Sequence, residues 1–353
     1  MEPVTHLLTG ACLARAGLNR RAAYATLAMV LAAEVPDADT LWAFDGPVAV
    51  LQHHRGWTHS FLGLPFEALG VVGFIWLLHR WRERRRERGG VTRAPVRWGL
   101  LWIFCVIALL SHLLLDWTNN YGVRPFFPFN PHWYAGSFVF IFDPAISAVL
   151  LIALVAPSLF SLVGSEVGAQ RVTFQGRGWA VAALIGIVGL WGWRAFEHHR
   201  ALDLATTGDY GQTQIAPDQI KRIFASPDPL NPYRWHMIIE TPSAYQLAQA
   251  EMWRNTMAAS PDDLLYKPPT TLATLPAKRS WLGEAYLDWS SYPLVTDIGP
   301  DGDGLTEVTF RDLRFMYDTF LTRGRQVAPL SGIVYLDAEH RVRQVEMDGR
   351  FQH

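Results

Sequence analysis

Four long apolar runs constrain the fold of this chain more than any other feature of its sequence. They cover residues 61–79, 98–115, 138–163 and 179–196, and each contains at most one charged side chain. Each run is close to the roughly 20 residues that a helix needs to cross a bilayer. All four lie before residue 198. The sequence therefore predicts that the N-terminal half is an α-helical polytopic membrane bundle.

Two shorter apolar runs precede these four. They cover residues 4–18 and 22–35 and flank Arg15, Arg20 and Arg21. Both are short for a full crossing. We expect them to form a helical hairpin.

Charge is divided unevenly along the chain. Residues 1–197 carry 16 Arg, no Lys and 12 acidic residues, whereas the remainder carries 15 basic and 20 acidic residues. The overall net charge of −1 argues against a nucleic acid partner. Cys12 and Cys105, the two cysteines, both lie in apolar stretches, which argues against a disulfide scaffold and against a thiolate zinc site.

Arginine placement predicts the orientation of the bundle. The loop at residues 80–97 contains eight Arg and two Glu, so the positive-inside rule places it in the cytoplasm. Counting crossings from there puts the polar C-terminal half outside. We therefore expect a multi-pass protein whose C-terminal domain is extracytoplasmic.

The C-terminal half has the texture of a small β-rich (α+β) domain. Residues 234–240, 305–311, 332–336 and 342–346 alternate or are rich in β-forming side chains. Residues 301–304 read Asp-Gly-Asp-Gly, which favours a hairpin turn over a calcium loop because the full EF-hand pattern is absent. The predicted organisation is a membrane-embedded metal-site domain at 1–197, a linker at 198–217 and a soluble β-rich domain at 218–353.

Ionisable side chains near apolar spans are costly and point to function. Here they form five groups, and the predicted topology places all five at the extracytoplasmic ends of helices. The groups are Thr5-His6, Glu34 to Asp39, His53 to Ser60, His112 to Asp116, and Asp143-Pro144.

The residue types in these groups are typical of a metal site. Neutral imidazole and carboxylate are ligands of zinc and related divalent ions. His112 and Asp116 are four residues apart, so they share one face of a helix. His54 and His59 lie five apart across a glycine, which suits a loop that opens into a helix. A hydrogen-bonded pair inside the bundle is the alternative interpretation of His112 and Asp116.

Other polar residues extend the predicted site. Arg55 could bind an anionic substrate oxygen or could pair with Asp39 or Asp143. Asn119 and Tyr121 could orient ligands or substrate, and Asp143 belongs with them in this interpretation. The aromatic residues between Pro125 and Trp133 favour an interface belt.

These motifs resemble the YdjM-like family of bacterial inner-membrane proteins. The resemblance rests on Thr5-His6, on Pro36-Asp37-x-Asp39, on His54-Arg55-Gly56-x-Thr58-His59-Ser60 and on His112-x-x-x-Asp116-x-x-Asn119-x-Tyr121-Gly122. It covers roughly residues 1–200, and the region of Trp235 resembles a C-terminal extension that some members carry. The family is described as metal-dependent hydrolases, some under LexA control. The resemblance implies His54, His59, His112 and Asp116 as the leading metal residues, followed by His6, Asp37 and Asp39.

The order of these residues is also distantly similar to zinc-dependent phospholipase C and related nucleases. This sequence lacks their second helical His-x-x-x-Glu pair, which puts a trinuclear site in doubt. One or two divalent ions, zinc first among them, are expected.

The predicted function is a metal-dependent hydrolase in the bacterial inner membrane. Its substrate would be a membrane lipid or a lipid-linked (phospho)ester at the extracytoplasmic face. Asp37 or Asp39 would accept a proton from water, and Arg55 would stabilise the developing anion. The alternatives are a transporter or metal-binding scaffold without hydrolytic activity, and an anchor for a C-terminal domain that binds a protein partner.

Overall fold

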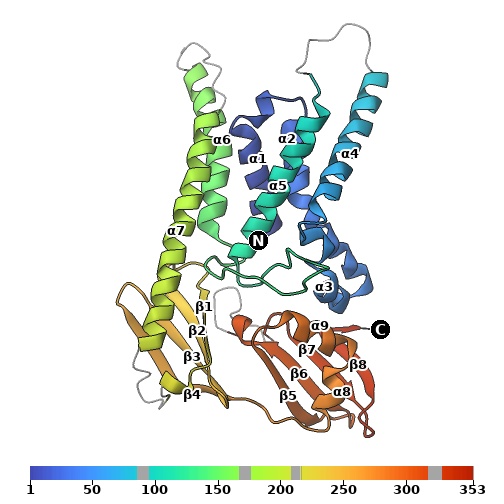
Figure 1. Ribbon diagram of the computed structural model, residues 1–353, viewed down its shortest axis with the longest axis vertical. Coiled ribbons are helices and arrows are strands. Elements are labelled where there is room, and N and C mark those ends of the chain that lie inside the picture. The colour runs from blue at the N-terminus through green and yellow to red at the C-terminus, as the bar shows by residue number, and fades with distance from the viewer. Residues whose placement is uncertain (86–94, 167–175, 208–214, 216, 317–327, 353) are drawn as a thin grey trace. The chain divides into compact units, whose positions relative to one another are not determined.

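The protein is described by a computed structural model that divides into two compact units (Figure 1). The helical unit comprises residues 1–38 and 55–195, and the C-terminal unit comprises residues 39–54 and 196–353. The structure describes residues 1–85, 95–166, 176–207, 215, 217–316 and 328–352. Part of the arginine-rich loop at 80–97 lies outside these described residues.

The N-terminal half is helical, as the apolar runs predict. The hairpin expected from the two short runs is present, with a 3-10 turn at Leu18–Arg20 between its helices. The principal helices are α1 (Pro3–Arg15), α2 (Ala25–Glu34), α4 (Leu64–Arg84), α5 (Trp98–Thr118), α6 (Pro144–Glu166) and α7 (Arg177–Thr207).

Small residues let these helices approach one another closely. A Cβ atom at Gly10 of α1 would lie 2.6 Å from the carbonyl oxygen of Met29 in α2, so only glycine fits there. Ala28 and Ala32 of α2 and Ala108 of α5 are fully buried in the same core. Close contact between small residues is how helices pack in a membrane, where burial of apolar surface supplies little net driving force.

Two of the described helices, α5 and α7, are long and apolar enough to cross a membrane. The number rises to three if the bent pair of Pro47–His59 and Leu64–Arg84 counts as one span. The helix in the apolar run at 138–163 is shorter at its start than predicted, because α6 begins only at Pro144. The apolar described part of α6, Pro144–Phe160, is shorter than a full span.

The C-terminal unit contains two antiparallel sheets. The four strands of the first, β1–β4, and the five of the second, β5–β9, are each paired in sequence order. The expected strands at 234–240 and 332–336 coincide with β2 and β7. The strands are Arg222–Pro227, Arg234–Glu240, Ala244–Glu251, Thr256–Tyr266, Pro293–Pro300, Thr306–Asp312, Gly332–Leu336, Val342–Met347 and Arg350–Gln352.

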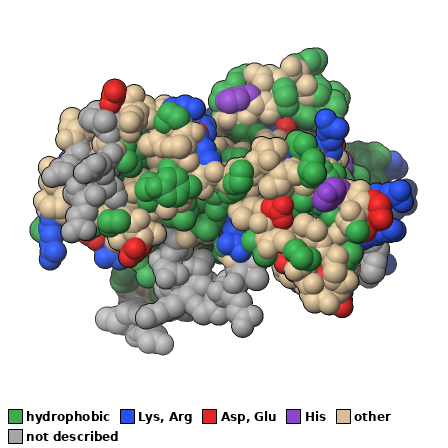
Figure 2. All heavy atoms as spheres, turned by 90° about the horizontal axis from the view of Figure 1, so that it is seen from below, with side chains coloured by type: hydrophobic (Ala, Val, Ile, Leu, Met, Phe, Trp, Pro, Cys, Tyr) green, Lys and Arg blue, Asp and Glu red, His purple; other side chains and the backbone are tan. Residues whose placement is uncertain are grey.

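Turn chemistry and a shared core organise the two sheets. Asp301 accepts hydrogen bonds from the backbone of Asp303 and Leu305 at 2.9 and 2.8 Å, which closes the β5–β6 hairpin and confirms the turn predicted there. Ile238 of the first sheet and Leu294 of the second belong to one buried cluster. On the molecular face in Figure 2, hydrophobic side chains are interspersed with charged ones.

Two short helices and one segment from the N-terminal half complete the C-terminal unit. The helices α8 (Thr274–Lys278) and α9 (Trp281–Trp289) connect the two sheets. The helix α3 (Pro47–His53) packs on α9, where the Trp281 indole donates a 2.7 Å hydrogen bond to Gln52. Residues 39–54 therefore group with the later sequence, although we predicted them within the membrane domain. The predicted linker also begins as helix, because α7 continues to Thr207.

Candidate metal centre

Four side chains of the helical unit bring their donor atoms together. Asp37 lies in the 3-10 segment Val35–Asp45 that follows α2, and His59 ends the 3-10 turn Trp57–His59. His112 and Asp116 lie on α5. One ligand atom from each of the four lies within 4.8 Å of the others. We call these four residues the metal centre.

The spacings within the metal centre match the requirements of a small divalent ion. The Nε2 atoms of His59 and His112 face each other at 3.0 Å. Asp116 Oδ2 lies 3.3 and 3.5 Å from these two nitrogens, and Asp37 Oδ1 lies 3.5 and 3.6 Å from them. Four tetrahedral ligands at about 2.0–2.1 Å from an ion lie about 3.3–3.4 Å from one another. The five distances cluster around that value.

The metal centre is closed on most sides. His59, His112 and Asp116 have no exposed side-chain surface, whereas the side chain of Asp37 is 13% exposed. Asp37 therefore marks the side from which a small molecule can reach the centre.

A backbone carbonyl fixes the orientation of His112. Its Nδ1 lies 2.7 Å from the carbonyl oxygen of Ala33, and a carbonyl can only accept, so Nδ1 carries the hydrogen and Nε2 offers a lone pair to the centre. This carbonyl is among the last four of α2, which have no partner inside their own helix. The end of α2 thus selects the tautomer that can bind a metal.

The turn that carries His59 is held by its own motif. Thr58 Oγ1 lies 3.0 Å from Nδ1 of His59, on the ring edge opposite the centre. Ser60 Oγ donates to the Trp57 carbonyl at 2.8 Å and accepts from the Gly63 amide at 3.1 Å, which ties the turn to the start of α4. Arg55 begins the turn at a φ of 58°, a left-handed conformation that is uncommon outside glycine and concentrates at functional sites.

Arg55 holds Asp116 from the side away from the histidines. Its Nη2 donates to Asp116 Oδ1 at 2.9 Å, and its Nη1 donates to the Gly122 carbonyl at 2.6 Å. Asn119 Oδ1 accepts from the Tyr121 amide at 2.8 Å, and the guanidinium lies 4.7 Å from the centre of the Tyr121 ring. Asn119 and Tyr121 thus surround the arginine that positions Asp116.

His6 lies next to the metal centre. Its ring stacks on His112 with centroids 3.7 Å apart, and its Nε2 lies 3.4 Å from Asp116 Oδ1. The amino group of Met1 contacts Asp116 as well and lies 3.0 Å from His6 Nε2.

The residues present fit a divalent ion. His6 Nδ1 and Asp116 Oδ2 are buried and have no hydrogen-bond partner within the described part of the chain. Buried polar atoms are normally satisfied, so an orphaned carboxylate oxygen that faces two imidazole nitrogens calls for a cation. Two imidazoles and two carboxylates form a mixed nitrogen and oxygen donor set suited to catalytic divalent metals.

Three predicted site residues are not among these four. Asp39 and His54 contact each other, with 2.7 Å between Oδ1 and Nδ1, and the division into units assigns both to the C-terminal unit. Asp143 accepts from Arg194 at 2.8 Å and from the Ala145 amide at 2.9 Å, so it caps α6 and pairs with α7. Arg55 pairs with Asp116 rather than with either predicted carboxylate.

Three groups that contact predicted site residues were not predicted from the sequence. The Ala33 carbonyl has no side-chain signature at all, because any residue supplies a carbonyl. Thr58 stands within a motif that the sequence already singled out, and Arg194 is the one charge in its apolar run. These last two could have been found from their positions.

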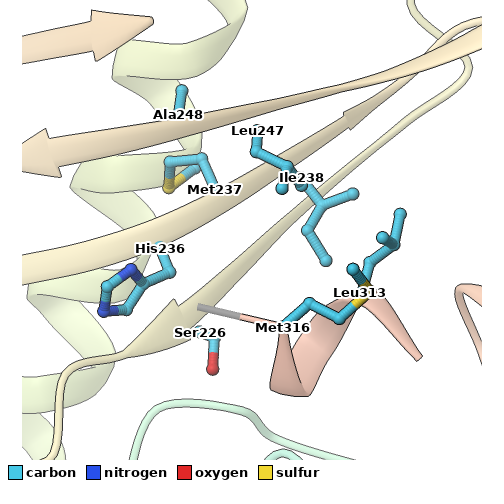
Figure 3. A pocket seen from close by; sticks show the side chains of 8 residues that line it. All are labelled: Ser226, His236, Met237, Ile238, Leu247, Ala248, Leu313 and Met316. Carbon is cyan, nitrogen blue, oxygen red and sulfur yellow. The ribbon is translucent and has the colours of Figure 1, made fainter. Parts of the chain in front are cut away.

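A separate small pocket lies in the C-terminal unit (Figure 3). Its lining is mainly apolar and comes from the first sheet and from the 3-10 turn Leu313–Phe315 and the residue after it. Among the described residues that line it, His236 is the one ionisable side chain, and its Nε2 lies 3.5 Å from Asp228 Oδ2. Hydrogen bonds from His236 and the Asn231 amide lower the pKa of Asp228 to about 2, outweighing the burial that raises it. The lining residues are Ser226, His236, Met237, Ile238, Leu247, Ala248, Leu313 and Met316.

The sequence that carries the metal centre matches a known protein family. Residues 1–201 match the model of the family described as YdjM inner membrane protein. The chain belongs to that family. The match confirms the resemblance found in the motifs and contains all four residues of the metal centre, together with His6, Arg55 and Asn119.

A curated relative shares part of this sequence. The uncharacterized protein YfhP of Bacillus subtilis (strain 168) is 25% identical over 154 residues, which cover 41% of this chain and 43% of that protein. The chain therefore matches less than half the length of this relative. No solved structure gives a significant match.

Proposed function

We propose that this YdjM family member is a multi-pass inner-membrane hydrolase that depends on one divalent metal ion, with zinc as the first candidate. The observation that carries the proposal is the convergence of four donor atoms at spacings of 3.0–3.6 Å inside a buried helical core. Zinc is preferred because mixed imidazole and carboxylate ligation at tetrahedral spacing is typical of its hydrolytic sites.

One ion suits the charges around Asp116 better than two. Its Oδ2 faces the two histidines, whereas its Oδ1 is held by the Arg55 guanidinium at 2.9 Å. A second ion on the Oδ1 side would lie against a fixed positive charge. We therefore assign one ion to the metal centre, with His6 as a neighbour that packs on His112.

We assign a separate role in hydrolysis to the ion, to Asp37 and to Arg55. A divalent ion bound in the centre would act as a Lewis acid toward an ester oxygen and toward water. We assign Asp37, the one member of the four with exposed side-chain surface, as the carboxylate that would accept a proton from the attacking water. His59, His112 and Asp116 would then hold the ion and leave its fourth position for water. Arg55 is a positioning residue, because it acts through Asp116.

The proposed substrate is a lipid or lipid-linked phosphoester. The position of the centre at the end of an apolar helix long enough to cross a membrane supports this class, since Asp116 lies two residues before Thr118, the last residue of α5. The C-terminal unit would lie outside the cytoplasm. Reporter fusions after residues 88 and 353 test this topology, and signals from the same side would contradict it.

Packing below the centre supports a hydrolase over a transporter. Leu109, Cys105 and Leu101, which follow the centre along α5 toward its other end, are fully buried among apolar neighbours. An ion pathway needs polar groups that continue across the bilayer. In the described part of α5 the polar side chains stop near the centre.

The test is hydrolysis by purified full-length protein in detergent. The protein is stripped with a chelator, reloaded with zinc and assayed on a phospholipid and on bis(p-nitrophenyl) phosphate. We expect activity to return with the metal, to be absent in His59→Ala and to persist in Ser111→Ala, a neighbour of His112 that bonds its own helix. A metal-loaded protein that hydrolyses neither compound would favour the scaffold.

A further inference from the structure

Exposed aromatic side chains lie in two segments of the helical unit, one that contains His59 and one that follows α5. Trp57, Phe61, Phe126 and Phe129 are 57, 49, 49 and 85% exposed. We call these four residues the aromatic surface. Such a cluster is unusual on a protein surface that faces water and calls for an apolar partner.

Two segments distant in sequence form this surface together. The Phe61 amide donates to the Pro125 carbonyl at 2.8 Å. The rings of Phe61 and Phe126 meet edge to face at 5.5 Å, and those of Trp57 and Phe127 do so at 5.7 Å. The aromatic surface is therefore one structural feature with a fixed backbone contact.

Stacked side chains join the aromatic surface to the metal centre. The Arg124 guanidinium lies 5.1 Å from the Phe127 ring centre and 4.5 Å from that of Trp133. Its Nε donates to the backbone oxygen of Arg55 at 3.4 Å. Because Arg55 holds Asp116, these contacts connect the exposed rings to a carboxylate of the metal centre.

The position of these segments indicates the partner. Phe61 lies three residues before the start of α4 at Leu64, and the Phe126 segment follows the end of α5 at Thr118. The 21 residues of α5 span about 31 Å, close to the thickness of the bilayer hydrocarbon. Both segments therefore adjoin the membrane interface, where aromatic side chains concentrate.

Composition excludes a partner recognised through charge. Residues 56–63 and 125–134 contain no Lys, Arg, Asp or Glu. A protein partner that bound through ion pairs would find none in these segments, whereas acyl chains and the apolar side of the interface match them.

We propose that the aromatic surface is the entry site for a membrane lipid, whose acyl chains contact Trp57, Phe61, Phe126 and Phe129 while its phosphoester reaches the metal centre. This inference rests on the proposed hydrolase function and specifies how its substrate arrives. The aromatic surface contributes to binding of the lipid, and the metal centre contributes the chemistry.

The first test compares two substrates on full-length protein reconstituted in phosphatidylethanolamine and phosphatidylglycerol vesicles. The double variant Phe126→Ser/Phe129→Ser should lower hydrolysis of vesicle phospholipid about tenfold, equivalent to about 1.4 kcal/mol. Hydrolysis of soluble bis(p-nitrophenyl) phosphate should stay within about twofold, because the metal centre is unchanged. The control is Trp81→Ser on α4, which is 50% exposed and lies twenty residues after Phe61. Equal losses on both substrates would overturn the proposal.

A second test does not depend on activity. A spin label at Phe129→Cys is selective because the native Cys12 and Cys105 are buried. We expect the label to collide with oxygen, as it does within a bilayer, and to be shielded from a water-soluble nickel reagent. A label that the nickel reagent reaches in the vesicles as readily as a label in water would overturn the proposal. If the wild-type protein hydrolysed neither substrate, the hydrolase function would fail, and label depth would still decide whether the surface meets lipid.

Discussion

The helical unit leaves a buried carboxylate oxygen of Asp116 facing two histidines, whereas in the C-terminal unit the buried Arg314 and Asp312 satisfy each other at 2.8 Å. In the helical unit, the buried Asp116 converges with His59 and His112 on one point, and the buried Arg55 holds its other carboxylate oxygen. In the C-terminal unit, Arg222 and Arg234 pair with glutamates across neighbouring strands while their side chains remain 53 and 41% exposed. Surface pairs of this kind are satisfied by water and contribute little. The buried donor atoms of the metal centre need a cation to satisfy them, whereas the exposed ion pairs do not. This difference distinguishes a candidate binding site from surface ion pairs.

The largest expected effect is the loss of metal binding in His112→Ala. This variant removes one of four donors, and the zinc affinity should fall by more than about 100-fold, beyond the 10–100-fold typical of losing an outer partner. His53→Ala is the matched control, because this imidazole stacks on Trp42 in the C-terminal unit. Competition with a chromogenic chelator measures both affinities. Equal losses would show that the centre is misassigned.

The next effect concerns stability rather than metal. Asp143→Ala should destabilise the helical unit by about 3 kcal/mol, because it leaves the buried Arg194 guanidinium without its carboxylate and removes the cap of α6. Thermal unfolding in detergent measures the change. The folded fraction should still bind zinc with unchanged affinity, and a large loss of affinity would place Asp143 at the metal centre after all.

A smaller effect is expected for Arg55→Lys. Lysine keeps the charge but cannot bridge Asp116 and the Gly122 carbonyl with a planar fork. The zinc affinity should fall about 10-fold, in the range of outer partners. Arg15→Lys provides a control, since Arg15 donates to the Leu154 carbonyl elsewhere in the helical unit. An unchanged affinity in Arg55→Lys would remove the positioning role.

The smallest effect lies in the C-terminal unit. Burial raises the pKa of Glu240, but hydrogen bonds from Lys267 and Arg222 outweigh it and hold the pKa below its usual 4.5. A carboxyl whose pKa is lower when folded contributes stability above the unfolded value and loses it as the pH falls through the folded value. Glu240→Gln should therefore cost less than about 1 kcal/mol at pH 7, and the difference should shrink below about pH 4. Urea unfolding at several pH values checks the sign, and a gap that widens in acid would contradict it.

Hydrophobic runs and residue spacing predict much of this structure. The apolar runs locate the helices, and the four-residue spacing of His112 and Asp116 puts both on one face of α5. Strand β2 coincides with the alternating run at 234–240. These features are local, so they can be predicted from neighbouring residues alone.

The rest depends on contacts between distant segments. His54 and His59 are five residues apart, yet His54 pairs with Asp39 whereas His59 joins the centre. The role of Asp143 follows from where α6 begins, which the continuous apolar run conceals. The carbonyl that orients His112 belongs to Ala33 in the last turn of α2. No side-chain pattern in the sequence predicts this contact.

X-ray absorption at the zinc edge of the metal-loaded, full-length protein would identify the ligands of the metal centre. We expect one zinc per chain with four nitrogen and oxygen ligands at about 2.0–2.1 Å, including a signature of two imidazoles that drops to one in His59→Ala. A sulfur ligand, a six-oxygen shell or an imidazole signature that survives unchanged in His59→Ala would contradict this expectation.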